Sequence, residues 1–424
     1  MTSLWWRVRG FFAGLGPGLI TGAADDDPSG ISTYSVAGAA TGYSTLWLAL
    51  VSTPMMAVIQ GMCARIAMVN GEGLAAIVRK TLPPWLAYGL AGLVIIANTF
   101  NVGADIGGMA AAAQLVVPIP VDALVFLFGI GLIAIQTWLS YSTIERIFKW
   151  LTLTLFAYVV TAFVVRPPWG DILLHVAIPR IHLDAIWLAT VVGVLGTTIT
   201  PYLFFWQSAL MIEEEKKAGK TTLRKRRGTN ATDVAAMHAD VNAGMIFSNL
   251  VAFFIIVTTA ATLGAHGKHD IQTAKQAAEA LRPLAGQFAS LLFTLGMVGT
   301  GILAVPVLAT SSAYVAAETL GFREGLGESL RRAPLFYGII AAGILIGIAM
   351  NLLQVDAIKA LFWSAVLNGV AAVPLIAVIV WLASRRKTMG EWISSPIARA
   401  WGWGTFALMA GATVGMFYFM IRPG

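Results

Sequence analysis

Residues 23–30 read AADDDPSG, and they place three consecutive aspartates and a proline inside an otherwise apolar segment, residues 11–40. That segment is long enough to cross a lipid bilayer as a helix. A charged side chain at bilayer depth costs about 3 kcal/mol, so acids kept there indicate a function. Proline removes a backbone hydrogen bond and clashes with the preceding turn. The stretch therefore predicts a transmembrane helix interrupted at its acids; the alternative is a helix end that the acids cap at the water interface.

The composition of the whole chain indicates a membrane protein. Of its 424 residues, 58% are hydrophobic and only 12% are charged, which is about half the charged fraction of a soluble domain. We expect an all-α polytopic fold in a single transporter domain, residues 1–424. The eleven runs long enough to span a bilayer are 11–38, 44–68, 85–116, 120–140, 147–165, 184–211, 237–264, 286–316, 334–353, 357–383 and 400–421.

The basic residues are unevenly distributed between alternate connecting segments. With the N-terminus inside, 21 of the 28 lysines and arginines lie in or beside cytoplasmic segments. The positive-inside rule then predicts a multi-pass protein of the inner (plasma) membrane, with a cytoplasmic N-terminus and an outer C-terminus. The most basic segment, residues 213–227, is interpreted as a lipid-facing cytoplasmic loop rather than a nucleic-acid site, so we expect no nucleic-acid partner.

The longest outer loop, residues 265–283, carries three potential metal ligands: His266, His269 and Asp270. Imidazole and carboxylate groups at this spacing could capture a metal ion. Polar side chains in a hydrophilic loop are more often simply solvated. We favour solvated side chains, with metal capture as the alternative.

A second break is predicted in the sixth span, where residues 193–202 read GVLGTTITPY and again combine small residues, hydroxyls and a mid-span proline. The sixth span lies five spans after the first, so the two breaks occupy corresponding positions if the chain contains a repeat of five spans. Interrupted helices at corresponding positions of two five-helix halves are typical of inverted-repeat transporters with a site at the bilayer midplane. We therefore expect one repeat over residues 11–165, an oppositely oriented one over 184–383, and an additional span over 400–421.

The two breaks together offer oxygen ligands to a cation. The carbonyls freed by an interrupted helix need a partner, and a cation supplies one. The Asp27 carboxylate, the hydroxyls of Thr197 and Thr200, and carbonyls near Ala24 and Thr197 would form an all-oxygen site. Such a site suits hard divalent cations, Mg²⁺ above all. Cysteine, methionine and histidine are absent from both breaks, so nothing there selects a soft transition metal.

Further polar residues are predicted to line the pathway. Asp25 and Asp26 point to other helix faces than Asp27, at about 100° per residue, and we expect them to line a vestibule. In the third span, spacings of three and four place Asn98, Asn101 and Asp105 on one face. Asp105 is interpreted as a proton-relay acid, a group that supports the ligands, or part of an interhelical hydrogen-bonding cluster. The predicted pathway residues are thus Asp25, Asp26, Asn98, Asn101, Asp105 and, in the tenth span, Asn368 as a pore-lining or helix-packing group.

The two breaks resemble motifs of the NRAMP divalent-metal transporters. GPGLITGAADDDPSG, residues 16–30, resembles the first-span motif Asp-Pro-Gly-Asn, and GTTITPY, residues 196–202, resembles the sixth-span motif Gly-Ala-Thr-Val-Met-Pro-His. The likeness covers nearly the whole chain, including the third-span aspartate and DIQTAKQAAEALRPLAG, residues 270–286. It implies the leucine-transporter fold, with a metal ion held between the unwound first and sixth helices.

The chain departs from the family pattern at specific positions. Asp27 matches the metal-binding aspartate, and Ala24 matches the alanine that donates a carbonyl. In the first span, Gly30 stands where the family has its asparagine ligand. In the sixth span, Thr197 stands in place of the family's alanine, Thr200 in place of its methionine and Tyr202 in place of its histidine. The asparagine ligand is therefore absent, as is the methionine that favours manganese and iron. In the third span Asp-x-x-Glu becomes Asp105 with Gly108, so the acid thought to help carry protons is missing.

These departures resemble the NRAMP-related magnesium transporter branch, in which the soft ligand and proton coupling are lost. The resemblance implies a transporter without a cofactor, not an enzyme, that imports Mg²⁺, with Mn²⁺ also accepted, by alternating access. Two ligands fewer suggest a wider site for an ion that keeps much of its water. Tyr202 and Asp105 would shape the pathway. The alternative is a proton- or sodium-coupled symporter of a small organic solute on the same fold.

Overall fold

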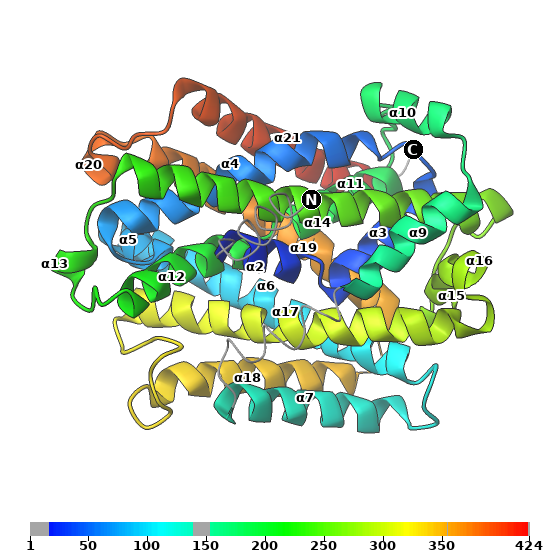
Figure 1. Cartoon of the computed structure of the whole chain (residues 1–424), viewed down its shortest axis with the longest axis horizontal. Helices are drawn as coiled ribbons and strands as arrows, with labels where there is room; N and C mark the ends of the chain where they lie inside the picture. Colours follow the sequence, from blue (N-terminus) through cyan, green and yellow to red (C-terminus); the bar gives the residue numbers. More distant parts are fainter. Residues whose placement is uncertain (1–16, 139–152, 354, 423–424) are drawn as a thin grey trace, which may run out of the picture.

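The computed structural model describes residues 17–138, 153–353 and 355–422, and these residues form a bundle of α-helices (Figure 1). Nine helical segments of this described part are long and apolar enough to cross a membrane. They are α4 (Trp47–Asn70), α6 (Pro84–Ala113), α7 (Val121–Trp138), α11–α12 (Ala185–Thr198 and Pro201–Lys217), α14 (Ala231–Thr262), α17 (Ala289–Leu320), α18 (Pro334–Asn351), α19 (Ala357–Ala383) and α21 (Pro396–Ile421). The predicted all-helical class is confirmed, and each segment falls on a predicted span.

The other two predicted spans are the first and the fifth. The first is split into α2 (Pro17–Asp25) and α3 (Pro28–Thr41). Residues 147–152 of the fifth lie outside the described residues, and its described part is a 3₁₀ turn, η1 (Leu153–Leu155), followed by the short apolar helix α9 (Phe156–Val165). The interruption predicted from the Asp-Pro sequence is therefore present where the proline requires it.

Small residues bring the two interrupted spans close to their neighbours. Lipid offers no hydrophobic drive between helices, so close backbone approach and packing hold them together. A methyl group added at Gly196 of α11 would lie 2.2 Å from the carbonyl oxygen of Ala365 on α19. One added at Gly22 of α2 would lie 2.3 Å from the carbonyl oxygen of Gly244 on α14. Glycine at these positions thus sets how closely the half-helices beside each break pack.

The connecting segments fall into two groups at opposite ends of the bundle (Figure 1). One end carries α5 (Leu74–Thr81), α13 (Leu223–Arg226) and α20 (Arg386–Met389). The other carries α10 (Trp169–Ala177), α15 (Ala274–Ala278) and α16 (Arg282–Ala285). This grouping matches the predicted alternation, because the basic segments share an end; which end faces the cytoplasm stays a prediction.

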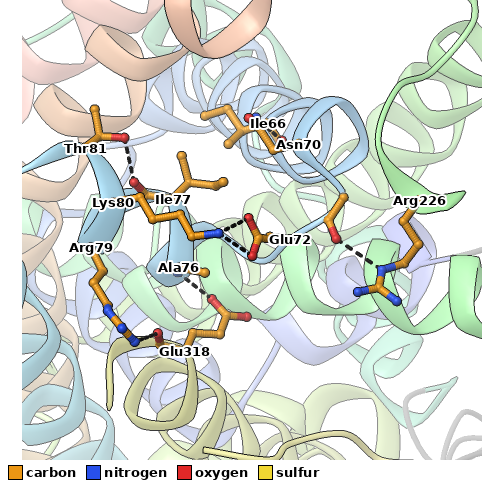
Figure 2. Close-up of polar contacts among 11 residues, drawn as sticks. Ile66, Asn70, Glu72, Ala76, Ile77, Arg79, Lys80, Thr81, Arg226 and Glu318 are labelled. Atoms are coloured by element: carbon orange, nitrogen blue, oxygen red, sulfur yellow. Dashed lines mark hydrogen bonds and ion pairs between the residues drawn. The ribbon is translucent and has the colours of Figure 1, made fainter. Parts of the chain in front are cut away.

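Charged groups join the helices at the basic end (Figure 2). Glu318 of α17 accepts a hydrogen bond of 3.1 Å from the Ala76 backbone N–H, in the first turn of α5. Arg79 donates to the Glu318 carbonyl oxygen at 3.4 Å, and Lys80 pairs with Glu72. A cavity of about 290 Å³ opens beside these groups, also lined by Lys216, Arg226 and Glu324. The short helix between α4 and α6 is thereby attached to α17.

Candidate functional site

The first break is organised by Asp27. Pro28 occupies the first position of α3, where its missing N–H costs nothing, and Asp27 is the N-cap. Its Oδ1 accepts hydrogen bonds from the Gly30 backbone N–H (2.6 Å) and the Ser29 hydroxyl (2.8 Å). The cap of the alternative interpretation is thus present, but Asp27 is only 1% exposed and lies deep in the bundle.

Helix α6 supplies two more contacts to this break. The Asn101 side-chain amide donates to Asp27 Oδ2 at 3.1 Å, and the Ser29 backbone N–H donates to Asp105 Oδ1 at 3.2 Å. Asp105 Oδ2 has no hydrogen-bond partner among the described residues. Asn98, one turn before Asn101, instead donates to a serine hydroxyl on α17 at 3.0 Å. Of the three residues on the predicted polar face, Asn101 and Asp105 contact the first break, whereas Asn98 joins α6 to α17.

The second break lies between Thr198, where α11 ends, and Pro201, where α12 begins. The Thr198 hydroxyl donates a hydrogen bond to the carbonyl oxygen of Val194 on its own helix. Thr200 is the N-cap of α12, but its side chain makes no capping bond. Its hydroxyl is buried and has no partner in the part of the chain that the structure describes. Thr200 is therefore an available oxygen donor.

The two breaks meet in space. A methyl group added at Gly30 would lie 3.1 Å from the Thr197 hydroxyl oxygen, so these predicted positions are neighbours. The Tyr202 hydroxyl donates to the carbonyl oxygen of Ala24 at 2.8 Å. Ser311 of α17 donates to the Tyr202 carbonyl at 2.8 Å and fixes the start of α12. The carbonyl that the first break frees is thus satisfied by a phenol of the second break.

Asp25 and Asp26 turn toward α14 rather than toward Asp27's partners. The Ser248 hydroxyl lies 2.6 Å from Asp25 Oδ2 and 3.3 Å from Asp26 Oδ1. Both acids are at most 1% exposed. In this structure neither acid faces an open vestibule, because α14 packs directly against α2.

Sequence reasoning missed Ser248 and Tyr34. Tyr34 is fully buried on α3, and its hydroxyl lies next to Thr197 of the second break. Tyr34 lies seven residues after Asp27, which is two helical turns along the same face, so its spacing was a usable signal. Ser248 offered no comparable signal, because its contact depends on how α14 crosses α2.

Asn368 lies buried on α19, one residue before Gly369. A methyl group added at Gly369 would approach the Gly196 Cα of α11 to 3.3 Å. The Asn368 side-chain oxygen has no partner within the described ranges. Its position beside the crossing of α11 and α19 suits either of its predicted roles.

The predicted outer-loop cluster has other partners. His266 contacts the carbonyl oxygen of Thr262 at 2.6 Å through Nδ1. His269 contacts the carbonyl oxygen of Ala39 at 3.0 Å, and Asp270 accepts from Gln272 at 2.5 Å. Across residues 17–138, 153–353 and 355–422, three or more His, Cys, Asp or Glu side chains nowhere come close enough to hold a metal ion. A cation site in this part of the chain must therefore add hydroxyls, carbonyls or waters to its carboxylates.

Comparison with known proteins places these features in a family. The model described as "Natural resistance-associated macrophage protein-like" matches residues 18–419. The chain is 28% identical over 395 residues to the divalent metal cation transporter MntH of Acidiphilium cryptum, covering 91% of this chain and 85% of the relative. It is 27% identical over 420 residues to MntH of Aeromonas hydrophila subsp. hydrophila, covering 96% of each.

Solved structures show the same fold. A manganese transporter of Eremococcus coleocola, in complex with an aromatic bis-isothiourea substituted compound, superposes with a TM-score of 0.73 at 19% identity, over 97% of this chain and 86% of that one. Mhp1, a nucleobase-cation-symport-1 family transporter in a closed conformation, superposes with a TM-score of 0.55 at 12% identity, over 95% and 92%. The expected leucine-transporter fold is therefore confirmed.

Proposed function

Because the chain belongs to the NRAMP family, we propose that it imports Mg²⁺, with Mn²⁺ also accepted, by alternating access and without proton coupling. Membership makes it a multi-pass membrane transporter of divalent metal cations and not an enzyme, with the metal as its substrate. The finer statements, on the ion and on coupling, depend on the chemistry of the two breaks.

The observation that carries the choice of ion is the all-oxygen chemistry where the breaks meet. Thr197 lies beside Gly30, the Thr200 hydroxyl has no partner among the described residues, and the Ala24 carbonyl lies at the first break, where the Tyr202 hydroxyl bonds it. Softer transition metals gain from thioether and imidazole ligands, whereas Mg²⁺ binds oxygen almost exclusively. A site built from a carboxylate, hydroxyls and carbonyls therefore favours Mg²⁺. Mn²⁺ also accepts oxygen ligands, so we expect the site to bind it as well.

The ion would keep much of its water. Asp27 Oδ1 accepts hydrogen bonds from two donors in the first turn of α3, and Oδ2 accepts one from Asn101 among the described residues. Gly30 supplies no side chain where the resemblance places an asparagine ligand. Mg²⁺ gives up its waters reluctantly and is commonly held by one or two carboxylates with several waters retained. Thr197 and Thr200 would then act directly or through those waters.

The absence of proton coupling is supported by the surroundings of Gly108 on α6. A methyl group added there would lie 2.7 Å from Leu361 Cδ1 and 3.3 Å from Met297 Cε. Apolar side chains thus fill the space next to the position where the resemblance places a proton-carrying glutamate. With two positive charges per ion, an inside-negative potential supplies about 2.3 kcal/mol per charge per 100 mV, which drives uptake without protons.

Reconstituted liposomes test this proposal. With an inside-negative potassium diffusion potential, an internal dye should report Mg²⁺ influx while a second dye reports no internal acidification. Asp27→Ala should abolish influx, whereas Asp122→Ala, at an exposed position at the start of α7, should leave it unchanged. A strong preference for Fe²⁺ or Cd²⁺, or influx that always acidifies the lumen, would refute the proposal.

A further inference from the structure

A second cavity lies at the basic end of the bundle and shares two lining residues with the cavity described above. Its volume is about 220 Å³, and it lies between the ends of α4 and α5, the residue that follows α13, and α20. Four basic side chains and one acid line it: Lys80, Arg227, Arg385, Lys387 and Glu72. Cations that are far apart in sequence therefore meet at one cavity.

Only one of these four basic side chains has an acidic partner. Lys80 pairs with Glu72 (Figure 2), whereas the ion pairs of the described residues do not include Arg227, Arg385 or Lys387. Arginine stays protonated at any physiological pH. The two arginines therefore cannot reduce their repulsion by releasing a proton, but a bound anion would reduce it.

The segment that carries Arg227 is attached to the end of α4. Arg226 Nε donates to the Gly71 carbonyl oxygen at 3.1 Å, and the Gly228 backbone N–H donates to the Val69 carbonyl oxygen at 3.0 Å. Gly71 has a φ of +69°, and a methyl group added there would lie 2.9 Å from the Arg226 carbonyl carbon, so glycine permits this close approach. These contacts lie on both sides of Arg227 and hold it at the cavity.

Arg385 is restrained by an aromatic ring. Its guanidinium carbon lies 4.3 Å from the centroid of the Trp381 ring, near the end of α19. Such a contact limits the motion of a guanidinium without using its N–H donors. A guanidinium can then hold two oxygens of one phosphate group at once. Lys387 follows on α20, which the fully buried Met389 anchors to the bundle.

Exposed tryptophans indicate that the cavity lies at the level of the lipid headgroups. Trp85, 75% exposed, lies at the start of α6 directly after α5. Trp401 and Trp403, 39% and 43% exposed, lie near the start of α21, which follows α20. Tryptophan is enriched where the hydrocarbon meets the headgroups, and basic pockets between helices at this level suit anionic lipids.

We propose that Arg227, Arg385 and Lys387 bind the phosphate group of an anionic phospholipid in this cavity. The arginines supply paired N–H donors to the phosphate oxygens, and Lys387 supplies a point charge. A bound headgroup would join the ends of α13 and α19 and so stabilise the fold. The proposal does not depend on which ion is transported, because the two breaks lie deep in the bundle.

The melting temperature of the purified full-length protein, titrated with lipid in detergent micelles, measures this binding, since a ligand of the folded state stabilises it. Phosphatidylglycerol should raise the melting temperature, whereas phosphatidylcholine, which has no net charge, should not. Arg227→Gln/Arg385→Gln/Lys387→Gln should weaken the apparent affinity for phosphatidylglycerol about hundredfold, because each basic residue contributes about fivefold. Arg385→Gln alone should weaken it about fivefold, which keeps the test decisive if the triple variant fails to fold.

Arg323→Gln/Arg331→Gln/Arg332→Gln is the matched control. It removes the same charge from exposed positions between α17 and α18, at the same end of the bundle and outside the cavity, and should leave the affinity unchanged. An equal loss in both triple variants would reveal diffuse attraction and overturn the site, as would a wild type that phosphatidylglycerol does not stabilise. Inorganic phosphate, compared with chloride at equal ionic strength, separates the two sources of phosphate. If it stabilises the wild type as well as the lipid does, and the cavity variant loses this response, the lipid is overturned in favour of a soluble phosphate.

Discussion

Replacing Tyr202 with phenylalanine tests how the second break controls ligands of the first. The Tyr202 hydroxyl holds the carbonyl oxygen of Ala24 at 2.8 Å. We expect an ion that binds this carbonyl to compete with the hydroxyl for the electron density of the oxygen, although the carbonyl has two lone pairs. Tyr202→Phe removes the competitor and keeps the ring, while the Ser311 bond to the Tyr202 backbone carbonyl can remain.

The size of the effect follows from that hydrogen bond. A buried bond between neutral groups contributes about 1 kcal/mol net, which corresponds to about fivefold in a binding constant. Tyr202→Phe should therefore bind Mn²⁺ about fivefold more tightly than the wild type. Without metal, the variant leaves the Ala24 carbonyl buried and unpaired, at a cost to folding stability of about 1–3 kcal/mol. Saturating Mn²⁺ should then raise the melting temperature more in the variant than in the wild type.

Titration calorimetry with Mn²⁺ and Mg²⁺, and thermal unfolding with and without each ion, measure these two effects. Tyr314→Phe is the matched control, because the Tyr314 hydroxyl bonds the Leu326 backbone N–H instead; its ion affinity should stay unchanged. Weaker Mn²⁺ binding by Tyr202→Phe would refute the competition argument and show the phenol oxygen to be a ligand itself.

Three further substitutions test the surrounding structure. Glu318→Ala should lower the free energy of unfolding by about 1–3 kcal/mol, because the Ala76 N–H loses its acceptor. Glu318→Gln should lower it by less, and thermal unfolding of the two variants measures the difference. Burial, then the charge of Glu318, raises the pKa of Glu324 from 4.5 to about 9. Between these two pKa values the folded state keeps a proton on Glu324 that the unfolded state has lost. The free energy of unfolding therefore falls as pH rises from 4.5 to about 9. Glu324→Gln should make the melting temperature depend less on pH over this range. Gly196→Ala should destabilise the protein by about 1–3 kcal/mol through overpacking, since its methyl group would meet the Ala365 carbonyl; Gly411→Ala, with open space around it, should not.

The positions of the helices and of both breaks could be predicted from the sequence because they depend on local chemistry. Apolar runs of spanning length become helices in lipid, where each backbone group must be paired within its own segment. Pro28 and Pro201 each begin a helix, and both breaks fall immediately before them. The cap formed by Asp27 is equally local, since its partners lie two and three residues ahead.

The contacts between helices were harder to predict. Ser248 meets Asp25 across 223 positions of sequence, and this depends on the angle and rotation at which α14 crosses α2. Those quantities follow from close contacts such as Gly22 against Gly244, which hydropathy does not encode. The vestibule expected at Asp25 and Asp26 is closed for the same reason: the glycines let α14 pack directly over them.

The N-cap at Asp27 also has a consequence for calcium. One oxygen of this carboxylate is committed to holding the first turn of α3, so an arriving ion can use only the other without unravelling that turn. Ca²⁺, with its six to eight ligands, often gains two of them from one carboxylate, whereas octahedral Mg²⁺ takes one oxygen from each. If Asp27 holds the ion as proposed, we expect it to bind through a single oxygen and so to disfavour Ca²⁺, without any residue devoted to rejecting that ion.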